Sequence, residues 1–280
     1  MIKKLGLLFL LNALSLTLVS QQVKYTNKNF LKILYNDTSY INKKTRISKI
    51  FAHSLPGHWG EFVKGVDEDI VSKRKTIALT FDACGGKKGD GYDKELIDYL
   101  RAEKIPATLF VSGKWIDENL NTFLELSKDT LFEIENHGFN HQPCSVDGEV
   151  AYGIKGTPSI PDAFDEMEAN ELKIEALTGR RPVFFRSATA YIDEACAKIA
   201  RHLGITVVSF DVLAGDAIPF NHTETITQNV LRNIKPGAIV IMHFNHPEWN
   251  TYESLLEIIP ELKKREFHFA KLKDYPLKGR

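Results

Sequence analysis

The chain has no excess charge of either sign and lacks several short motifs by which large enzyme classes are recognised. Lys plus Arg and Asp plus Glu both total 36, so the formal net charge is zero, and no basic stripe favours nucleic acid or an anionic membrane surface as a partner. There is no Gly-x-Gly-x-x-Gly fingerprint, no phosphate-binding loop and no Gly-x-Ser-x-Gly elbow. Nucleotide-binding and serine-hydrolase functions therefore lack their main support, and a neutral polymer or a small molecule is the better expected partner.

Cysteine is scarce. The three cysteines, Cys84, Cys144 and Cys196, are too few for a disulfide scaffold, and at most one bridge can form among them. Cys84 and Cys144 each follow a motif that we assign below to the same site. A bridge between them, a shared metal ion and two unpaired thiols all stay open.

The N-terminus has the pattern of a secretory signal peptide over residues 1–20. Two lysines precede an apolar stretch at 5–19, which is shorter than the ~20 residues of a membrane span, and Ser20 is a small residue for cleavage. We therefore expect a secreted or periplasmic protein with no stable membrane insertion after cleavage. Leu18 is large for the position three residues before the cut, so a retained N-terminal anchor is the alternative.

Short apolar runs alternate with amphipathic stretches from Lys75 onward, which predicts repeated βα units and parallel strands. Residues 21–73 are polar, and we expect an extension there with one helix around 29–35. Strands are predicted at 76–81, 107–111, 131–136, 183–186, 206–211, 238–243 and 267–272. Helices are predicted at 92–103, 115–127, 161–178, 193–203, 223–233 and 252–265. The long loop at 142–160 is either a lid or substrate contact or a surface excursion.

Polar side chains with catalytic chemistry follow several of the predicted strands. Reactive groups of parallel α/β folds gather at the carboxyl ends of strands. The side chains in such positions here are Asp82, His137, His141, Arg186, Asp211, Asp216 and His243. One such residue alone is more often structural, but two imidazoles four residues apart can hold a cation while a carboxylate moves a proton. The set predicts a metal-assisted hydrolase.

These residues stand in motifs that resemble those of the polysaccharide deacetylases with the NodB homology domain, a carbohydrate esterase family. The motifs read TFDA at 80–83, HGFNH at 137–141, RSA at 186–188, FDVLAGDA at 210–217 and IMH at 241–243. The third keeps its arginine but lacks the proline of the family's Arg-x-Pro. The resemblance covers residues 75–272, and the run TFDACGG at 80–86 is similar to a subgroup of the family.

The resemblance implies an α/β fold, a distorted seven-stranded (β/α) barrel of the NodB type at 74–280 that follows the extension at 21–73. It also implies a metal-dependent enzyme, with Zn²⁺ as the expected ion, that hydrolyses N-acetyl groups of amino sugars. Peptidoglycan or a chitin-like glycan would be the carbohydrate polymer or oligosaccharide substrate.

The resemblance also implies a role for each motif residue. Asp82 would be the general base, while His137 and His141 would hold the metal. His243 would protonate the leaving amine, oriented by Asp216, and Arg186 would hold Asp82 ionised. A backbone N–H near Tyr191 or Ala190 would stabilise the oxyanion. Sugar contacts are expected from Tyr191, Met242, Trp249 and His246, with Trp115 as a further ring for stacking.

Ala83 departs from the family, which usually has a second aspartate there as the third metal ligand. Two imidazoles alone make a weak site. Asp82 itself, the sulfur of Cys84 or a water molecule would complete the ligand set. We favour Asp82 or water, because the Cys84 side chain should point to the opposite side of an extended segment from Ala83.

Two other functions remain open. Ala83 motivates a catalytically silent domain that binds glycan in the same cleft. A hydrolase of a small cyclic amide or imide is the second, and a cleft closed by the loop at 142–160 would favour it. We interpret His53, His58 and Trp59 as part of an ordered strap on the barrel, and Glu133 and Glu135 as structural.

Overall fold

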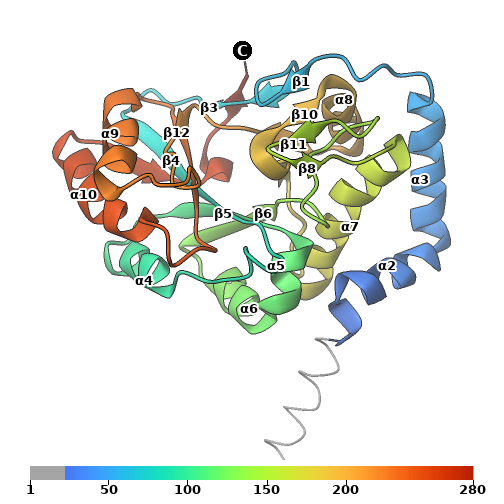
Figure 1. Cartoon of the computed structure of the whole chain (residues 1–280), viewed down its shortest axis with the longest axis horizontal. Coiled ribbons are helices and arrows are strands. Elements are labelled where there is room, and N and C mark those ends of the chain that lie inside the picture. The colour runs from blue at the N-terminus through green and yellow to red at the C-terminus, as the bar shows by residue number, and fades with distance from the viewer. Residues whose placement is uncertain (1–22, 280) are drawn as a thin grey trace, which may run out of the picture.

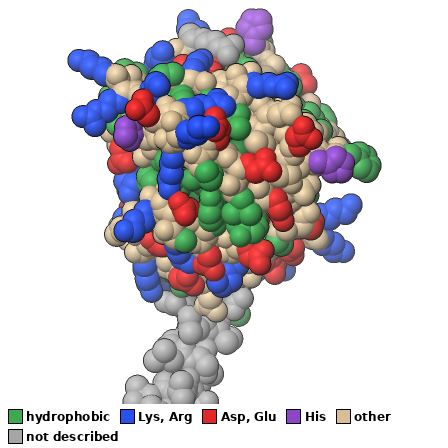
Figure 2. Space-filling model, turned by 90° about the vertical axis from the view of Figure 1, so that its left-hand side faces the viewer, with side chains coloured by type: hydrophobic (Ala, Val, Ile, Leu, Met, Phe, Trp, Pro, Cys, Tyr) green, Lys and Arg blue, Asp and Glu red, His purple; other side chains and the backbone are tan. Residues whose placement is uncertain are grey.

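A computed structural model describes residues 23–279 of the chain, so the predicted signal peptide lies outside the described residues. A curved sheet runs through the centre of the molecule, and helices lie around its outside (Figure 1). None of the helices within residues 23–279 is long and apolar enough to cross a membrane. Basic and acidic side chains are interspersed on the face that Figure 2 shows, in keeping with the balanced charge of the chain.

The main sheet is parallel and follows the order β12-β13-β4-β5-β6-β9-β11-β2, with β14 paired to β4. All seven predicted strands are present, as β4 (Thr76–Ala83), β5 (Ala107–Val111), β6 (Phe132–Asn136), β9 (Phe184–Phe185), β11 (Thr206–Val208), β13 (Ile239–His243) and β14 (His268–Ala270). The sheet gains β2 (Val66–Asp67) and β12 (Val212–Leu213), which have too few residues to show a period in the sequence. The fold is the predicted α/β class, an incompletely closed barrel.

The helices of the barrel agree closely with those predicted. They are α4 (Lys94–Ala102), α5 (Gly113–Glu118), α6 (Leu120–Lys128), α7 (Ile160–Thr178), α8 (Glu194–Leu203), α9 (Thr223–Asn233) and α10 (Thr251–Lys264). The helix predicted at 115–127 is two helices that meet at Asn119. Three helices begin at a side chain that accepts a backbone N–H three residues ahead: Asp93, Ser112 and Asp193.

The segment before the barrel is more regular than its polar composition predicts. It contains α2 (Asn27–Tyr35), close to the expected helix, and also α3 (Thr38–Phe51), in which only Tyr40 and Ile47 are fully buried. Both helices pack against α7 along one side of the molecule (Figure 1). Because β2 pairs with β11, the sheet begins before the boundary that we placed at residue 74.

The strap interpretation agrees with the structure. β1 (Trp59–Gly60) pairs with β10 (Ile192–Asp193), and the carbonyls of Pro56 and His58 accept N–H groups from the start of α8. A second short pair joins β3 (Asp69–Ile70) to β15 (Leu277–Lys278). These pairings attach residues 56–70 to the body of the barrel.

β4 has two distinct faces, because successive side chains of a strand alternate. Ile77, Leu79, Phe81 and Ala83 pack into the hydrophobic core between the sheet and the helices. The intervening side chains face the interior of the barrel, where Ala78 belongs to a separate apolar cluster and Thr80 and Asp82 are buried polar groups. The interior therefore becomes polar towards the carboxyl end of β4.

Trp115 is a core residue, which contradicts the stacking role that we predicted for it. Its side chain is fully buried, its ring packs edge-on against Phe244, and its indole N–H donates to the carbonyl of Gly91 at 2.8 Å. Trp115 is in the first turn of α5, and its ring belongs to the core between the sheet and the helices.

We expect Trp115→Ala to lower the free energy of unfolding by about 3–5 kcal/mol, because it leaves a large cavity in the core. The half-buried Trp249 provides the matched control, and Trp249→Ala should cost about 1 kcal/mol. Urea denaturation of both variants measures the difference. Equal losses for the two variants would contradict the placement of Trp115 in the core.

Candidate active site

The predicted catalytic residues meet at the carboxyl ends of the strands. Asp82 lies near the end of β4 and pairs in register with His243 at the end of β13. His137 and His141 follow β6, and Arg186 follows β9. Asp216 follows β12 and contacts His243 directly. The parallel register thus brings residues that are far apart in the sequence together at the carboxyl ends of the strands.

A buried ion pair orients Asp82. Arg186 Nη1 lies 2.9 Å from Asp82 Oδ1 and also donates to Thr80 Oγ1 at 2.8 Å. Its Nη2 donates to the carbonyl of Ser209 at 2.7 Å. Arg186 is fully buried, and Asp82 is 2% exposed. The pair uses one carboxylate oxygen and leaves Oδ2 for contacts in the site, as the predicted partnership requires.

His137 presents one nitrogen to the site. Its Nδ1 lies 2.9 Å from the carbonyl of Arg186, and since a carbonyl only accepts, Nδ1 carries the proton. Nε2 then has a lone pair and lies 3.7 Å from Asp82 Oδ2. Burial by itself lowers the pKa of His137, but Asp82, Cys84 and the carbonyl of Arg186 together outweigh burial and raise that pKa.

The His141 ring lies next to the ring of His137, with centroids 4.9 Å apart. Its backbone has a φ of 53°, the left-handed conformation, which is uncommon for a residue with a side chain. His141 Nε2 is buried and has no hydrogen-bond partner among residues 23–279. A buried imidazole nitrogen without a hydrogen-bond partner is suited to bind a metal ion.

Glu166 fixes the loop that carries the two histidines, a role that no motif of the sequence indicates. From the middle of α7 its carboxylate accepts the N–H of Asn140 and the N–H of Gln142, both at 2.9 Å. Burial raises the pKa of Glu166 to about 7. Gly138 lies against the same carboxylate with a φ of 86°, and a Cβ there would lie 2.2 Å from Glu166 Oε1.

Cys84 faces the histidines. Its Sγ lies 4.0 Å from His137 Nε2, and the donor atoms of Cys84, His137 and His141 all lie within 4.8 Å of one another. Cys84 does point to the opposite side of the segment from Ala83, as expected, but Ala83 is the residue that lies in the core, so the alternation does not exclude Cys84 from the site. Burial by itself raises the pKa of the Cys84 thiol, but His141, His137 and His243 outweigh it and hold that pKa well below its usual value.

No bridge joins the cysteines of the described residues. All three thiols are free, and Cys144 and Cys196 are buried together in a separate apolar cluster. Of the alternatives that the sequence left open, the structure shows unpaired thiols.

His243 and Asp216 form the expected pair. Asp216 accepts the backbone N–H of His243 at 2.7 Å, lies 3.2 Å from its Nδ1, and accepts the hydroxyl of Thr251 at 3.0 Å. Burial by itself lowers the pKa of His243, but Asp216 outweighs it and raises that pKa well above its ordinary value. With Nδ1 engaged by Asp216, Nε2 is the nitrogen that remains for a substrate.

Aromatic rings border the site on the strand-end loops. Trp249 packs edge-on against His243 and stacks on His246 at 3.7 Å between centroids. The ring of Tyr191 lies 5.6 Å from the ring of Trp59 and 5.6 Å from that of Tyr152. Three of the predicted substrate contacts, Tyr191, Trp249 and His246, thus stand in ring clusters.

Met242 does not face the site, which corrects our prediction of a sugar contact. Along β13 the side chains alternate, and Met242 is fully buried in the core between sheet and helices. Ile241 lies on the face of β13 that carries His243, in a small cluster with Ala190 and Phe210. The residue two before the histidine, not the one directly before it, therefore borders the site.

The long loop after the histidines is ordered by its own hydrogen bonds. It contains the hairpin β7 (Val150–Ala151) and β8 (Ile154–Lys155), and Val146 N donates to Asp193 Oδ2 at 2.7 Å. Tyr152, 76% exposed, places its ring at the tip of this hairpin against Tyr191.

Of the two expected oxyanion donors, the N–H of Ala190 already donates to the carbonyl of Ser187 at 2.9 Å, which leaves the N–H of Tyr191.

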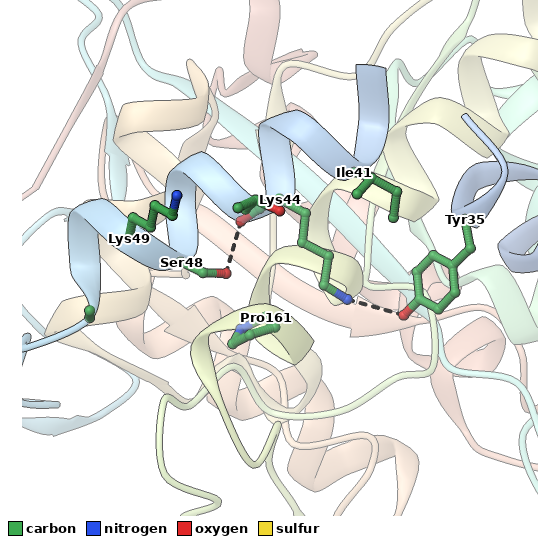
Figure 3. A pocket seen from close by; sticks show the side chains of 8 residues that line it. Tyr35, Ile41, Lys44, Ser48, Lys49 and Pro161 are labelled. Carbon is green, nitrogen blue, oxygen red and sulfur yellow. Dashed lines mark hydrogen bonds between the residues drawn. The ribbon is translucent and has the colours of Figure 1, made fainter. Parts of the chain in front are cut away.

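A pocket elsewhere on the molecule contains none of the strand-end residues. It lies between α3 and the start of α7, where the amine of Lys44 reaches the hydroxyl of Tyr35 at 3.1 Å (Figure 3). Lys44 also pairs with the carboxylate of Asp165 at 2.5 Å. Lys44 and Tyr35 are thus engaged with each other, and the strand-end cluster is the better candidate for catalysis.

Comparisons with known proteins show the family to which this sequence is similar. A family model for polysaccharide deacetylase matches residues 69–208. A peptidoglycan-N-acetylglucosamine deacetylase of Bacillus cereus is 28% identical over 212 residues, which cover 72% of this chain and 88% of the relative. A peptidoglycan-N-acetylmuramic acid deacetylase of Bacillus subtilis is 26% identical, with 72% of each chain covered.

Solved structures show the same fold. A carbohydrate esterase family 4 pseudoenzyme of Bacillus anthracis matches with a TM-score of 0.62 at 22% identity, over 74% of this chain and 67% of that one. The NodB-type barrel predicted from the motifs is thereby confirmed.

We expect Gly138→Ala to destabilise the protein by about 2–4 kcal/mol, because the methyl group meets the Glu166 carboxylate and the left-handed backbone is strained. Gly153 is the matched control: its φ is 79°, but no atom lies within 4 Å of a Cβ built there, so Gly153→Ala should cost only about 1–2 kcal/mol. Chemical denaturation measures both. If the two variants lose equal stability, the contact with Glu166 does not constrain the loop.

Proposed function

The chain belongs to the polysaccharide deacetylase family, and from this premise we propose that it is a metal-dependent hydrolase that removes N-acetyl groups from the amino sugars of peptidoglycan. The relatives named as peptidoglycan deacetylases favour that glycan over a chitin-like one. One observation carries the proposal: Asp82, two imidazoles and an Asp216-supported His243 lie together at the carboxyl ends of the strands. A peptidoglycan substrate agrees with the signal peptide predicted for residues 1–20.

The histidine pair suits a divalent cation. His137 Nε2 has a free lone pair, and His141 Nε2 is buried without a partner among the described residues. A divalent ion held there, with Zn²⁺ as the expected one, supplies a Lewis acid that polarises the acetamido carbonyl and lowers the pKa of the attacking water. The remaining chemistry belongs to the side chains.

Asp82 is the proposed general base. Arg186 holds Oδ1, so Oδ2 is the oxygen that takes a proton from water as it attacks the carbonyl carbon. His243 is the proposed general acid, because Asp216 raises its pKa, which favours the protonated ring, and its Nε2 is available to the leaving nitrogen. Asp216 positions the ring and stabilises its charge. The products are acetate and a free amino sugar.

The aromatic rings around the opening are the proposed sugar contacts. Tyr191 and Trp249 each present a half-buried ring, which suits stacking on the apolar face of a pyranose. His246 lies parallel to Trp249 and holds that ring in place. Met242 is left out of this proposal because it is buried in the core.

A catalytically silent glycan-binding domain is the second candidate. Ala83 favours it, since the carboxylate that the family usually has at this position is missing. The similarity to a structure described as a pseudoenzyme shows that the fold alone does not establish catalysis. Binding of glycan that is unchanged by a chelator, with no acetate released, would support this candidate. No contact among residues 23–279 favours a hydrolase of small cyclic amides or imides.

We expect Asp82→Asn and His243→Ala each to lower acetate release from peptidoglycan and from N-acetylglucosamine oligomers by about 10²–10⁴-fold, because each removes one proton-transfer group. His246→Ala, at the rim, should lose less than about tenfold. Acetate release and elemental analysis of the metal are measured together. Full turnover by His243→Ala with metal bound would refute the general-acid role, and loss of metal from Asp82→Asn would make Asp82 a ligand.

A further inference from the structure

Position 83 belongs to the core of this protein and not to the opening. Ala83 is fully buried and packs with Phe81 and Leu79 on the face of β4 that meets the helices. A side chain on that face cannot reach a metal held by the histidines unless the end of the strand rotates. The site therefore needs its third donor from another residue.

Cys84 stands where such a donor is required. One step beyond Ala83, alternation returns the side chain to the face that carries Asp82. The chain then turns at Gly85, whose φ is 78°, and Ser112 Oγ donates to the carbonyl of Cys84 at 2.5 Å. These contacts fix the backbone of Cys84 with its sulfur towards the histidines.

The three donor atoms are close enough to share one cation. Bond lengths of about 2.3 Å to sulfur and about 2.0–2.1 Å to imidazole nitrogen put neighbouring donors of a tetrahedral zinc site roughly 3.4–3.6 Å apart. Cys84 Sγ lies 4.0 Å from His137 Nε2, and the whole set lies within 4.8 Å. Small rotations of the side chains cover the difference. No other trio of this kind occurs in residues 23–279.

We propose that Cys84 is the third protein ligand of the metal, in place of the carboxylate that the family has at the preceding position. This assignment rests on the proposed function for the presence of a metal. On binding, the thiol gives up its proton to solvent and the thiolate bonds to the ion. Thiolate is a soft ligand, so the site selects Zn²⁺ or Co²⁺ over Mg²⁺ or Ca²⁺.

With Cys84 as a ligand, Asp82 no longer has to act both as general base and as metal ligand. Its Oδ1 is held by Arg186, and its Oδ2 is the only oxygen left for the site. With sulfur on the metal, Oδ2 stays available for the proton of the attacking water. Asp82 then serves as the base alone.

Cobalt spectroscopy tests the ligand independently of activity. The full chain, loaded with one equivalent of Co²⁺, should show the thiolate-to-cobalt charge-transfer absorption of the near ultraviolet. Cys84→Ser and Cys84→Asp should lose that absorption, and Cys84→Ser should bind Zn²⁺ at least tenfold more weakly in a chelator competition. Cys144→Ala, a buried cysteine outside the site, should keep both properties. Circular dichroism checks that each variant is folded.

The outcomes separate this inference from the proposed function. One bound metal per wild-type chain without the absorption would overturn Cys84 as ligand and leave the deacetylase proposal intact. Absorption that vanishes only in the Cys84 variants, without acetate release by the wild-type protein, would support the ligand and overturn the deacetylase proposal. Wild-type protein that binds neither Zn²⁺ nor Co²⁺ would overturn both.

Discussion

The alternation of side chains along β4 is the constraint on which the site depends. It sends Ile77, Leu79, Phe81 and Ala83 into the core beneath the helices and leaves Asp82 and Cys84 on the inner face. The buried Arg186 then pairs with Asp82, which makes the desolvation of both charges tolerable. Loss of either partner would leave an uncompensated charge inside the barrel, so the pair both stabilises the fold and orients Asp82, the proposed base.

Much of the fold could be predicted because its elements are long or strongly patterned. The seven predicted strands and six helical regions were found, since each has a clear apolar period or a cap such as Asp193. β2 and β12 were missed because two residues show no period. α3 was missed because its apolar side chains are few, and its stability comes from packing on α7, a tertiary effect that local composition does not contain.

The sequence correctly predicted which motif residues lie close together. It did not correctly predict which face of the strand the residues next to them occupy. Arg186 with Asp82 and Asp216 with His243 are pairs of opposite charge at strand ends, so the sequence was sufficient for them. Met242 was wrongly predicted to contact the sugar, because it directly precedes His243 and successive side chains of a strand point to opposite faces. Glu166 was missed because an acidic residue within a helix gives no sequence signal that it accepts N–H groups from a distant loop.

Ala83 and Cys84 are best understood as one coupled difference from the family. In this backbone, a carboxylate at position 83 would lie in an apolar cluster. Burial of an unpaired charge in such surroundings costs on the order of several kcal/mol. A methyl group instead fills that space, and the next side chain returns to the inner face with a metal-binding sulfur. The loss of an oxygen donor at one position and the gain of a thiol at the next thus follow from the same two-residue period. The absence of the second aspartate is for this reason weak evidence of an inactive site.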